Sequence, residues 1–427
     1  MRMQHLPLSC VRPSLLRLLS ADCVEWFVRN ARLPYWCAGG TAVCLSLLAC
    51  SAAETYSDSA TWSTDTLGSY IRIGVVDGDG RYVIDRPIVF RQLSDGRYLL
   101  AEFAGVIRLF DSKGEYVRHI GRRGRGPGEF EQLANVFVTE ADIILAYDYQ
   151  GARITHFDTT GTVIEEVALD HTFVWISLTD RFADGRFLGW SAPPVAGANG
   201  NTVVRLERDM FVFAPTGVLV DSLGTLTLGS TVVSGSGGSF TSFALPITAS
   251  GLQAIVGDQL VIAENDASTL AFYKETDEGA AGDAYATSYP ASRGSFVLQK
   301  VVVLPHPCVD HLLQADIDSL MRRYEAVSNV PARAPALRLI RSTLENEQVP
   351  CYRGIQIDRA DNIWLRRTTT PLNGLRPYTV VSSDGELLGD ALLPADLAVT
   401  EIGRDYVLGF QRDTNGVAYA VRLRLLR

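Results

Sequence analysis

One short pattern recurs along the chain and limits what it can fold into. An apolar residue is followed four positions later by a glycine, with turn residues between them, first from Phe110 to Gly114. The pattern returns at Phe157 to Gly161, Phe213 to Gly217 and Val381 to Gly385. Apolar and polar residues alternate on both sides of the first turn. Each copy therefore predicts a β-hairpin.

A second pattern lies upstream of the hairpins, where a polar turn opens directly into an apolar strand. It occurs six times, at Asp95-Gly96, Asp142, Asp184-Gly185, Gly257-Asp258, Asp361-Asn362 and Arg404-Asp405. With the strand before each turn, every unit has about four strands in roughly 40 to 50 residues, which is the size of one propeller blade. The pattern predicts an all-β, six-bladed β-propeller in residues 68–427.

The run GRRGRGPGEF, from Gly121 to Phe130, resembles the junction between blades in the NHL-repeat-type six-bladed β-propeller family. Residues 86–170 carry the resemblance best and residues 352–427 carry it moderately, whereas blades three and four lack this run. Its glycines do not indicate a phosphate loop, because no Lys-Ser or Lys-Thr pair follows and a strand is expected next. The resemblance implies a fold rather than an activity, since lyases, lactonases and binding modules share it.

Residues 309–350 break the strand pattern and predict two helices inserted between blades four and five. Apolar residues recur there at helical spacing, from Leu312 to Tyr324 and from Leu337 to Leu344. Helices this short are unstable alone, so we expect their apolar faces to pack on the propeller. Cys308 and Cys351 bracket the insertion. In an oxidising compartment this pair predicts a disulfide, with two buried free thiols as the alternative.

Residues 1–50 are expected to be a signal peptide outside the fold. An apolar run, Leu33 to Ala49, ends in the sequence LLACS, which is typical of a bacterial lipobox. It predicts a lipid on Cys50, with residues 51–67 as a tether and the protein at the cell envelope, on the periplasmic or extracellular side. An uncleaved transmembrane anchor is the alternative, but the apolar run is short for spanning a bilayer.

The two ends of the folded part are expected to pair. Tyr70 to Val76 predicts a strand without a local partner, whereas the last blade ends at Val417 to Leu426, one strand short. Pairing of these segments would remove the exposed edges of an open ring. Three irregular segments rich in small residues, at 191–202, 224–240 and 276–294, are expected to be loops available for recognition.

The charge of the chain argues against nucleic acid as a partner. The formal net charge is -9. Removing residues 1–50, which hold five arginines, Asp22 and Glu25, leaves 34 of the 39 basic and 46 of the 48 acidic residues. Nucleic acids bind basic surfaces. We expect a monomer whose ligand is a protein, a peptide or a carbohydrate, and whose membrane contact is the lipid.

No recognisable set of catalytic or metal-binding residues stands out. The chain has no Gly-x-Ser-x-Gly motif, and its histidines are not spaced as paired ligands. No cofactor is identified, although a calcium ion (Ca2+) held by scattered carboxylates is compatible with the sequence, since oxygen ligands need no fixed spacing. These observations favour a binding or scaffolding module. The alternative is a metal-dependent hydrolase or lyase with its site in the central channel.

The candidates for ligand contact lie where the second strand of each blade ends. Counting four residues past the first apolar position after each turn gives Glu102, Asp148, Ser191, Glu264, Arg367 and Gln411. In a closed ring, equivalent positions fall on one circle around the axis. Two hypotheses follow. The side chains cap their own turns, or the circle binds a ligand, in which case Arg367, its single cation, holds an anionic group.

The lipobox makes a prediction about Cys50. Replacing this residue by Ser removes the thiol to which the lipid attaches. We expect the Cys50→Ser protein to move from the detergent phase to the aqueous phase of a detergent extraction, whereas Cys44→Ser, in the same apolar run, should stay in the detergent phase. Unchanged partitioning of Cys50→Ser would contradict lipidation.

Overall fold

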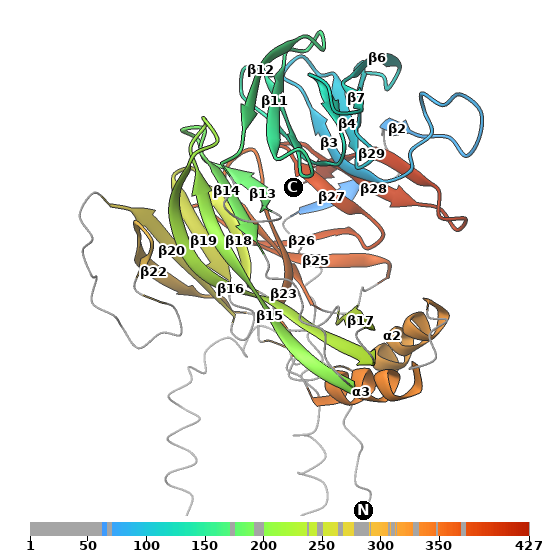
Figure 1. The fold of residues 1–427 in the computed structure, drawn as a ribbon, viewed down its shortest axis with the longest axis vertical. Coiled ribbons are helices and arrows are strands. Elements are labelled where there is room, and N and C mark those ends of the chain that lie inside the picture. Colours follow the sequence, from blue (N-terminus) through green and yellow to red (C-terminus); the bar gives the residue numbers. More distant parts are fainter. Residues whose placement is uncertain are drawn as a thin grey trace, which may run out of the picture. The chain divides into compact units, whose positions relative to one another are not determined.

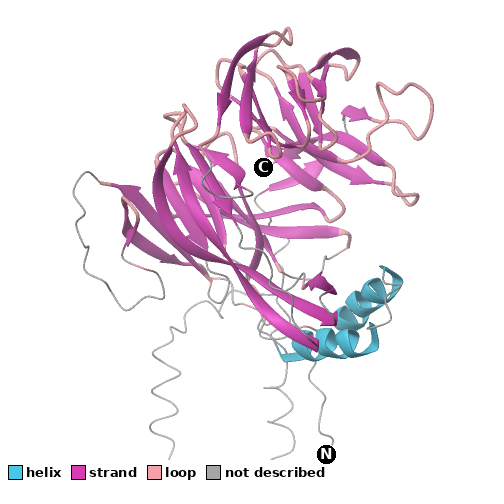
Figure 2. Cartoon of the chain, in the orientation of Figure 1, coloured by secondary structure: helices cyan, strands magenta, loops and turns pink. Residues whose placement is uncertain are grey.

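The chain is all-β apart from two helices in the part that the structure describes (Figure 2). The computed structural model describes residues 62–65, 71–170, 176–191, 200–236, 239–245, 251–263, 268–276, 290, 292–305, 308, 312, 314–327, 333–346, 349–368 and 373–426. The expected signal peptide with Cys50 lies outside these residues, as does Glu264. Neither described helix combines the length and the apolar character needed to cross a bilayer.

The first two sheets are four-stranded antiparallel meanders. Their strands are β3 (Pro87–Gln92), β4 (Tyr98–Glu102), β5 (Val106–Phe110), β6 (Tyr116–Ile120), β9 (Leu133–Val138), β10 (Ile144–Asp148), β11 (Arg153–Phe157) and β12 (Val163–Ala168), with the short parallel pair β7 (Arg122–Arg123) and β8 (Glu129–Phe130) between the two sheets. The hairpin turns explain the recurring pattern. The Asp111 carboxylate accepts backbone N–H bonds from Lys113 and Glu115 at 2.9 and 2.8 Å, while Gly114 adopts a φ of +84°.

The turns that lead into the second strands need a residue with positive φ. Gly96 and Gly185 supply it, at +86° and +97°, and Asp142 and Asp361 take the same role, at +58° and +60°. Aspartate enters this region more readily than most residues with a side chain. Asp142 also accepts a hydrogen bond from the Ser94 hydroxyl at 2.6 Å, which joins the second sheet to the first.

The third and fourth sheets have five strands each. They contain β13 (Ile176–Arg181), β14 (Phe187–Ser191), β15 (Gly200–Phe213), β16 (Leu219–Ser236) and β17 (Ser239–Ala244), then β18 (Leu252–Val256), β19 (Gln259–Ala263), β20 (Thr269–Glu275), β21 (Ser292–Arg293) and β22 (Phe296–Val303). The long β15–β16 hairpin corrects one expectation, because residues 224–236 continue a strand instead of forming a loop. Thr and Val suit a pleated strand, and Val232 pairs with Val203 and is fully buried.

The last sheet has nine strands, in the order β23-β24-β25-β26-β1-β29-β28-β27 with β2 beside β29. They are β23 (Tyr352–Ile357), β24 (Ile363–Arg367), β25 (Leu375–Val381), β26 (Leu387–Pro394), β27 (Ala398–Ile402), β28 (Tyr406–Arg412), β29 (Ala418–Leu426), β1 (Trp62–Asp65) and β2 (Ile71–Ile73). Pairing of β2 with β29 confirms the expected partnership of the two ends. The sheet also starts earlier than expected, because β1 lies within the predicted tether of 51–67 and pairs with both β29 and β26.

The packing of the strands closes on itself. The groups that begin with β3, β9, β13, β18, β23 and β27 share apolar cores in that order. The group that begins with β27 packs in turn on the first, where the Phe90 and Phe410 rings lie 6.1 Å apart. The first strands of these groups, called the inner strands below, contact one another in the same cyclic order.

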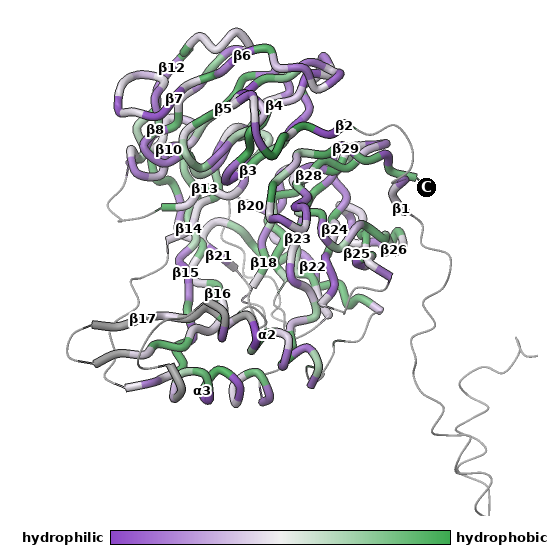
Figure 3. The backbone as a smooth tube through the Cα atoms, turned by 90° about the vertical axis from the view of Figure 1, so that its right-hand side faces the viewer, coloured by the Kyte–Doolittle hydropathy of each residue, from purple (hydrophilic) through white to green (hydrophobic). Residues whose placement is uncertain are grey.

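The two helices pack on the β15–β16 hairpin. They are α2 (Gln314–Val327) and α3 (Arg333–Asn346), and they follow β22 and precede β23 in the chain. Figure 1 shows them at the far end of β15 and β16. Their buried side chains meet Val232 of β16, and they are Ile317, Met321, Ala336, Ile340 and Leu344. Hydrophobic and hydrophilic residues alternate along α3 (Figure 3), so one face is buried and stabilises a helix too short to persist alone.

Cys308 and Cys351 form a disulfide, with Cα atoms 4.6 Å apart and a sequence separation of 43 residues. The bond joins the chain ahead of α2 to the start of β23. Both ends of the helical segment are therefore held at one place.

Removing this disulfide should destabilise the protein, because the bond closes a long loop and restricts the unfolded chain. The loop-entropy relation gives about 4 kcal/mol as an upper limit for a loop of this length. We expect the double variant Cys308→Ala, Cys351→Ala to melt at a lower temperature than the oxidised wild type, and close to the reduced wild type, in scanning calorimetry. A double variant as stable as the oxidised protein would show that the bond contributes nothing.

Candidate functional site

The polar residues at the ends of the second strands bond within their own sheets. Glu102 is buried at the end of β4 and forms an ion pair with Arg108 of β5. Asp148 is fully buried at the end of β10, where it accepts N–H bonds from two consecutive backbone amides at 3.1 and 3.0 Å. Such bonds are expected of side chains that cap turns.

Arg367 is also paired within its own sheet. Its side chain is 6% exposed, and its guanidinium lies 3.6 Å from the Asp390 carboxylate of β26. The charge of Arg367 is thus offset by a neighbour, which argues against the hypothesis that it holds an anionic ligand. Ser191 is buried at the end of β14. Gln411, by contrast, lines a pocket.

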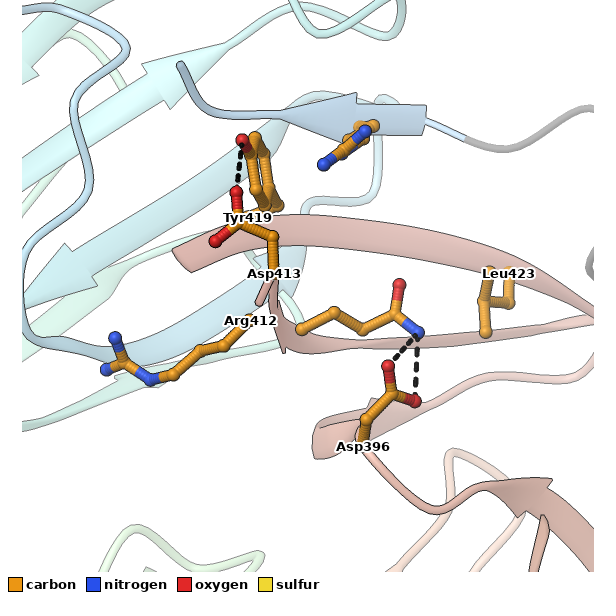
Figure 4. Close-up of a pocket in the computed structure, with 7 residues that line it drawn as sticks. Asp396, Arg412, Asp413, Tyr419 and Leu423 are labelled. Atoms are coloured by element: carbon orange, nitrogen blue, oxygen red, sulfur yellow. Dashed lines mark hydrogen bonds between the residues drawn. The ribbon is translucent and has the colours of Figure 1, made fainter. Parts of the chain in front are cut away.

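This pocket has a volume of about 300 Å³ and lies where β28 and β29 meet (Figure 4). It is lined by Arg72, Asp396, Gln411, Arg412, Asp413, Tyr419 and Leu423. The Gln411 amide donates to both carboxylate oxygens of Asp396, at 3.2 and 3.3 Å. Asp396 is exposed and Gln411 is half-buried, so a ligand can reach both groups. We call this cavity the Gln411 pocket.

Another part of the lining of the Gln411 pocket is fixed by the turn between β28 and β29. Asp413 accepts backbone N–H bonds from Asn415 and Val417, both at 2.9 Å, and the Tyr419 hydroxyl donates to its other oxygen at 3.3 Å. The Arg72 guanidinium lies 3.6 Å from the centre of the Tyr419 ring. Acidic, basic, amide and aromatic groups therefore surround one cavity, a combination that suits a polar ligand with several hydrogen-bonding groups.

A second polar cluster lies beside the inner strands. Glu401 of β27 is 3% exposed, and its carboxylate accepts the Tyr406 hydroxyl at 2.5 Å and lies 2.9 Å from Arg359 and 3.7 Å from Arg91. Burial of the Tyr406 hydroxyl and the adjacent Glu401 charge raise the pKa of Tyr406 well above its ordinary value. Since Arg91 belongs to β3 and Arg359 to the turn after β23, three groups of strands meet at one carboxylate.

Asp180 of β13 is equivalent to Arg91 of β3 and Glu401 of β27. Each of the three lies two residues before the residue whose backbone N–H donates a hydrogen bond across the next turn. It accepts backbone N–H bonds from Ile255 at 2.7 Å and from Arg181 at 2.8 Å. Burial raises the pKa of Asp180 to about 6, although these N–H bonds and the charge of Arg91 favour the ionised form. Carboxyls with such shifts are common at functional sites.

The sequence patterns singled out none of Arg91, Arg359 and Glu401, because these residues come from segments far apart in the chain. For Arg91 and Glu401, the available signal was an ionisable residue within the strand predicted before a turn. In the part of the chain with described geometry, no group of three or more His, Cys, Asp or Glu side chains is placed to hold a metal ion. The calcium site stays a prediction.

Comparisons with known proteins agree with a propeller fold. A family described as a 6-bladed beta-propeller matches residues 92–183. No curated protein sequence matches the chain. Together with the sheets, the family match defines the fold as a β-propeller.

Several solved structures resemble this one at low sequence identity. A Bacteroides fragilis protein described as exported is 13% identical with a TM-score of 0.45, over 84% of this chain and 95% of that chain. Virginiamycin B lyase from Staphylococcus aureus is 11% identical with a TM-score of 0.38, over 84% and 99%. A gluconolactonase from Xanthomonas campestris is 11% identical with a TM-score of 0.35, over 79% and 87%.

The raised pKa of Asp180 makes stability depend on pH. A carboxyl whose pKa is higher in the folded than in the unfolded protein stabilises the fold less as the pH rises from 3.8 to about 6, and its contribution stays low above that range. We expect Asp180→Asn to remove this loss. The variant should therefore gain stability relative to wild type between pH 4 and pH 7, by up to about 3 kcal/mol.

Urea unfolding of both proteins at the two pH values measures the difference. Glu140→Gln, at an exposed carboxylate in the turn before β10, is the control and should show no such gain. The same stability difference between Asp180→Asn and wild type at both pH values would refute the raised pKa.

Proposed function

We propose that this protein is an exported six-bladed β-propeller of NHL-repeat type, held at the bacterial cell envelope by a lipid on Cys50, and that it acts as a ligand-binding or scaffolding module. The six groups of strands are its blades, and α2 and α3 are an insertion between blades four and five. Cyclic packing of the groups and the family match over residues 92–183 support the blade count. The lipobox supports the anchor.

The Gln411 pocket carries the binding part of this proposal. Its volume of about 300 Å³ is at the lower end of the range for small-molecule sites, which is roughly 300 to 1,000 Å³. That size suits one sugar ring or one to two residues of a peptide. The pocket also lies at one of the positions selected from the sequence repeat, at the end of a second strand.

The groups around the pocket indicate the kind of ligand. The Asp396 carboxylate accepts hydrogen bonds, the Gln411 amide both donates and accepts, and Arg72 donates. Sugar hydroxyls and peptide amides also combine donors and acceptors at short spacing. A carbohydrate or a peptide therefore matches the pocket better than an apolar ligand does.

A screen of the purified protein against glycan and peptide libraries, followed by calorimetric titration of each hit, tests the proposal. We expect Gln411→Ala to weaken binding of a hit about tenfold, because a lost hydrogen bond to a well-placed amide is worth roughly 1 to 1.5 kcal/mol. Thermal stability should change little, since the side chain is half-buried near the end of its strand.

Gln299→Ala is the matched control, because Gln299 is an exposed glutamine on β22 outside the pocket. It should bind each hit as the wild type does. If wild type and Gln411→Ala bind every hit equally, the Gln411 pocket is not the binding site. Turnover of a hit that depends on an added divalent cation would favour the hydrolase or lyase alternative.

A further inference from the structure

Two arginines lie side by side on blade five, on the face opposite to Arg367. Arg366 of β24 is two residues from Trp364, and Arg376 of β25 is two residues from Tyr378. Because strand side chains alternate between faces, both arginines point to the same side as these aromatic residues. Trp364 and Tyr378 belong to the core between blades five and six. The arginines therefore lie at the end of that interface.

Neither of these two guanidiniums has an acidic partner in the described part of the chain, a property that the buried Arg208 shares. No carboxylate in the described part of the chain forms an ion pair with Arg366 or Arg376, whereas Arg108 pairs with Glu102 and Arg367 with Asp390. Arg366 donates from one terminal nitrogen to the backbone carbonyl of Arg353, at 2.7 Å.

Their Nε atoms lack hydrogen-bond partners as well, as do those of six other arginines in the described part of the chain. The Nε atoms of both Arg366 and Arg376 are buried and have no hydrogen-bond partner. A buried donor without an acceptor costs free energy, and the cost is larger when the group is charged. The rest of each side chain is half-buried, so solvent and small solutes reach the guanidiniums.

The positive charges of the two arginines also repel each other. Burial lowers the pKa of Arg366, and the neighbouring charge of Arg376 lowers it as well, while Tyr378 acts in the opposite direction. Two like charges in a partly dry site are unfavourable unless something negative lies between them. The fold therefore leaves two positive charges close together, which an anion bound at the terminal nitrogens of the guanidiniums would balance.

We propose that Arg366 and Arg376 form a binding site for a tetrahedral oxyanion, a phosphate or sulfate ion or the same group on a larger ligand. The guanidinium is planar and presents parallel N–H donors that match two oxygens of such an anion. A doubly charged anion matches two guanidiniums better than a carboxylate does. This site does not depend on the Gln411 pocket, whose residues come from other strands.

Calorimetric titration of the purified protein with sodium sulfate and with sodium phosphate, at an ionic strength held constant with sodium chloride, tests the site. We expect saturable binding of one anion per protein, with acetate binding more weakly. Arg366→Gln and Arg376→Gln should each weaken binding at least about tenfold, a factor that corresponds to about 1.4 kcal/mol. Arg376→Lys should give an intermediate affinity, because it keeps the charge but loses the planar fork.

Arg404→Gln is the matched control, since Arg404 is an exposed arginine in the turn between β27 and β28. It should bind sulfate as the wild type does. Circular dichroism checks that each variant is folded, and Arg376→Lys decides the outcome if a glutamine variant is not. Absence of saturable binding in the wild type, or equal affinity in the wild type and both glutamine variants, would overturn the proposal.

Discussion

The structure depends on how the outer edges of the last two groups of strands are covered. Without a neighbour, β26 and β29 would each present a row of unpaired N–H and C=O groups, which invites aggregation. β1 lies between them, parallel to β26 and antiparallel to β29, and merges both groups into one sheet. One strand of four residues therefore covers part of two edges, and β2 covers a further part of the β29 edge. It also brings the N-terminal side of the described fold against its C-terminal side.

The polar sites of this molecule are of two kinds, which differ in whether a charged side chain is balanced by a neighbouring charge of opposite sign. Where a carboxylate and an arginine come together, as in Glu102 with Arg108 or Glu401 with Arg359, the two charges balance each other and the pair mainly fixes the fold. Breaking such a pair leaves an uncompensated charge, so these residues are poor places for ligand exchange. The Gln411 pocket is different because Asp396 is exposed. Arg366 and Arg376 differ because the charge that would balance them is not supplied by their neighbours.

Local chemistry made part of this fold predictable. Asp111 and Gly114 build their turn within a few residues, so the hairpin pattern could be read without any knowledge of tertiary contacts. Residues 224–236 could not be identified in that way. Their glycines and serines are typical of a loop, and the strand is stabilised where α3, from a distant part of the chain, covers Val232. The same limit applies to the candidate sites. Counting along one strand found Gln411, but the cavity needs Arg72, and the Glu401 cluster needs β3 and β27 to meet.

The position of β1 also decides when the fold can be completed. Nearly all of the described chain lies between β1 and β29 in sequence, whereas most of the other strands pair with close sequence neighbours. Hairpins form within microseconds, but contacts between distant segments form slowly and only after the later segment has been synthesised. The ring must therefore stay open on the ribosome until β29 has emerged. Such a delay keeps the growing chain incompletely folded, which is the state in which a polypeptide can be threaded through a membrane.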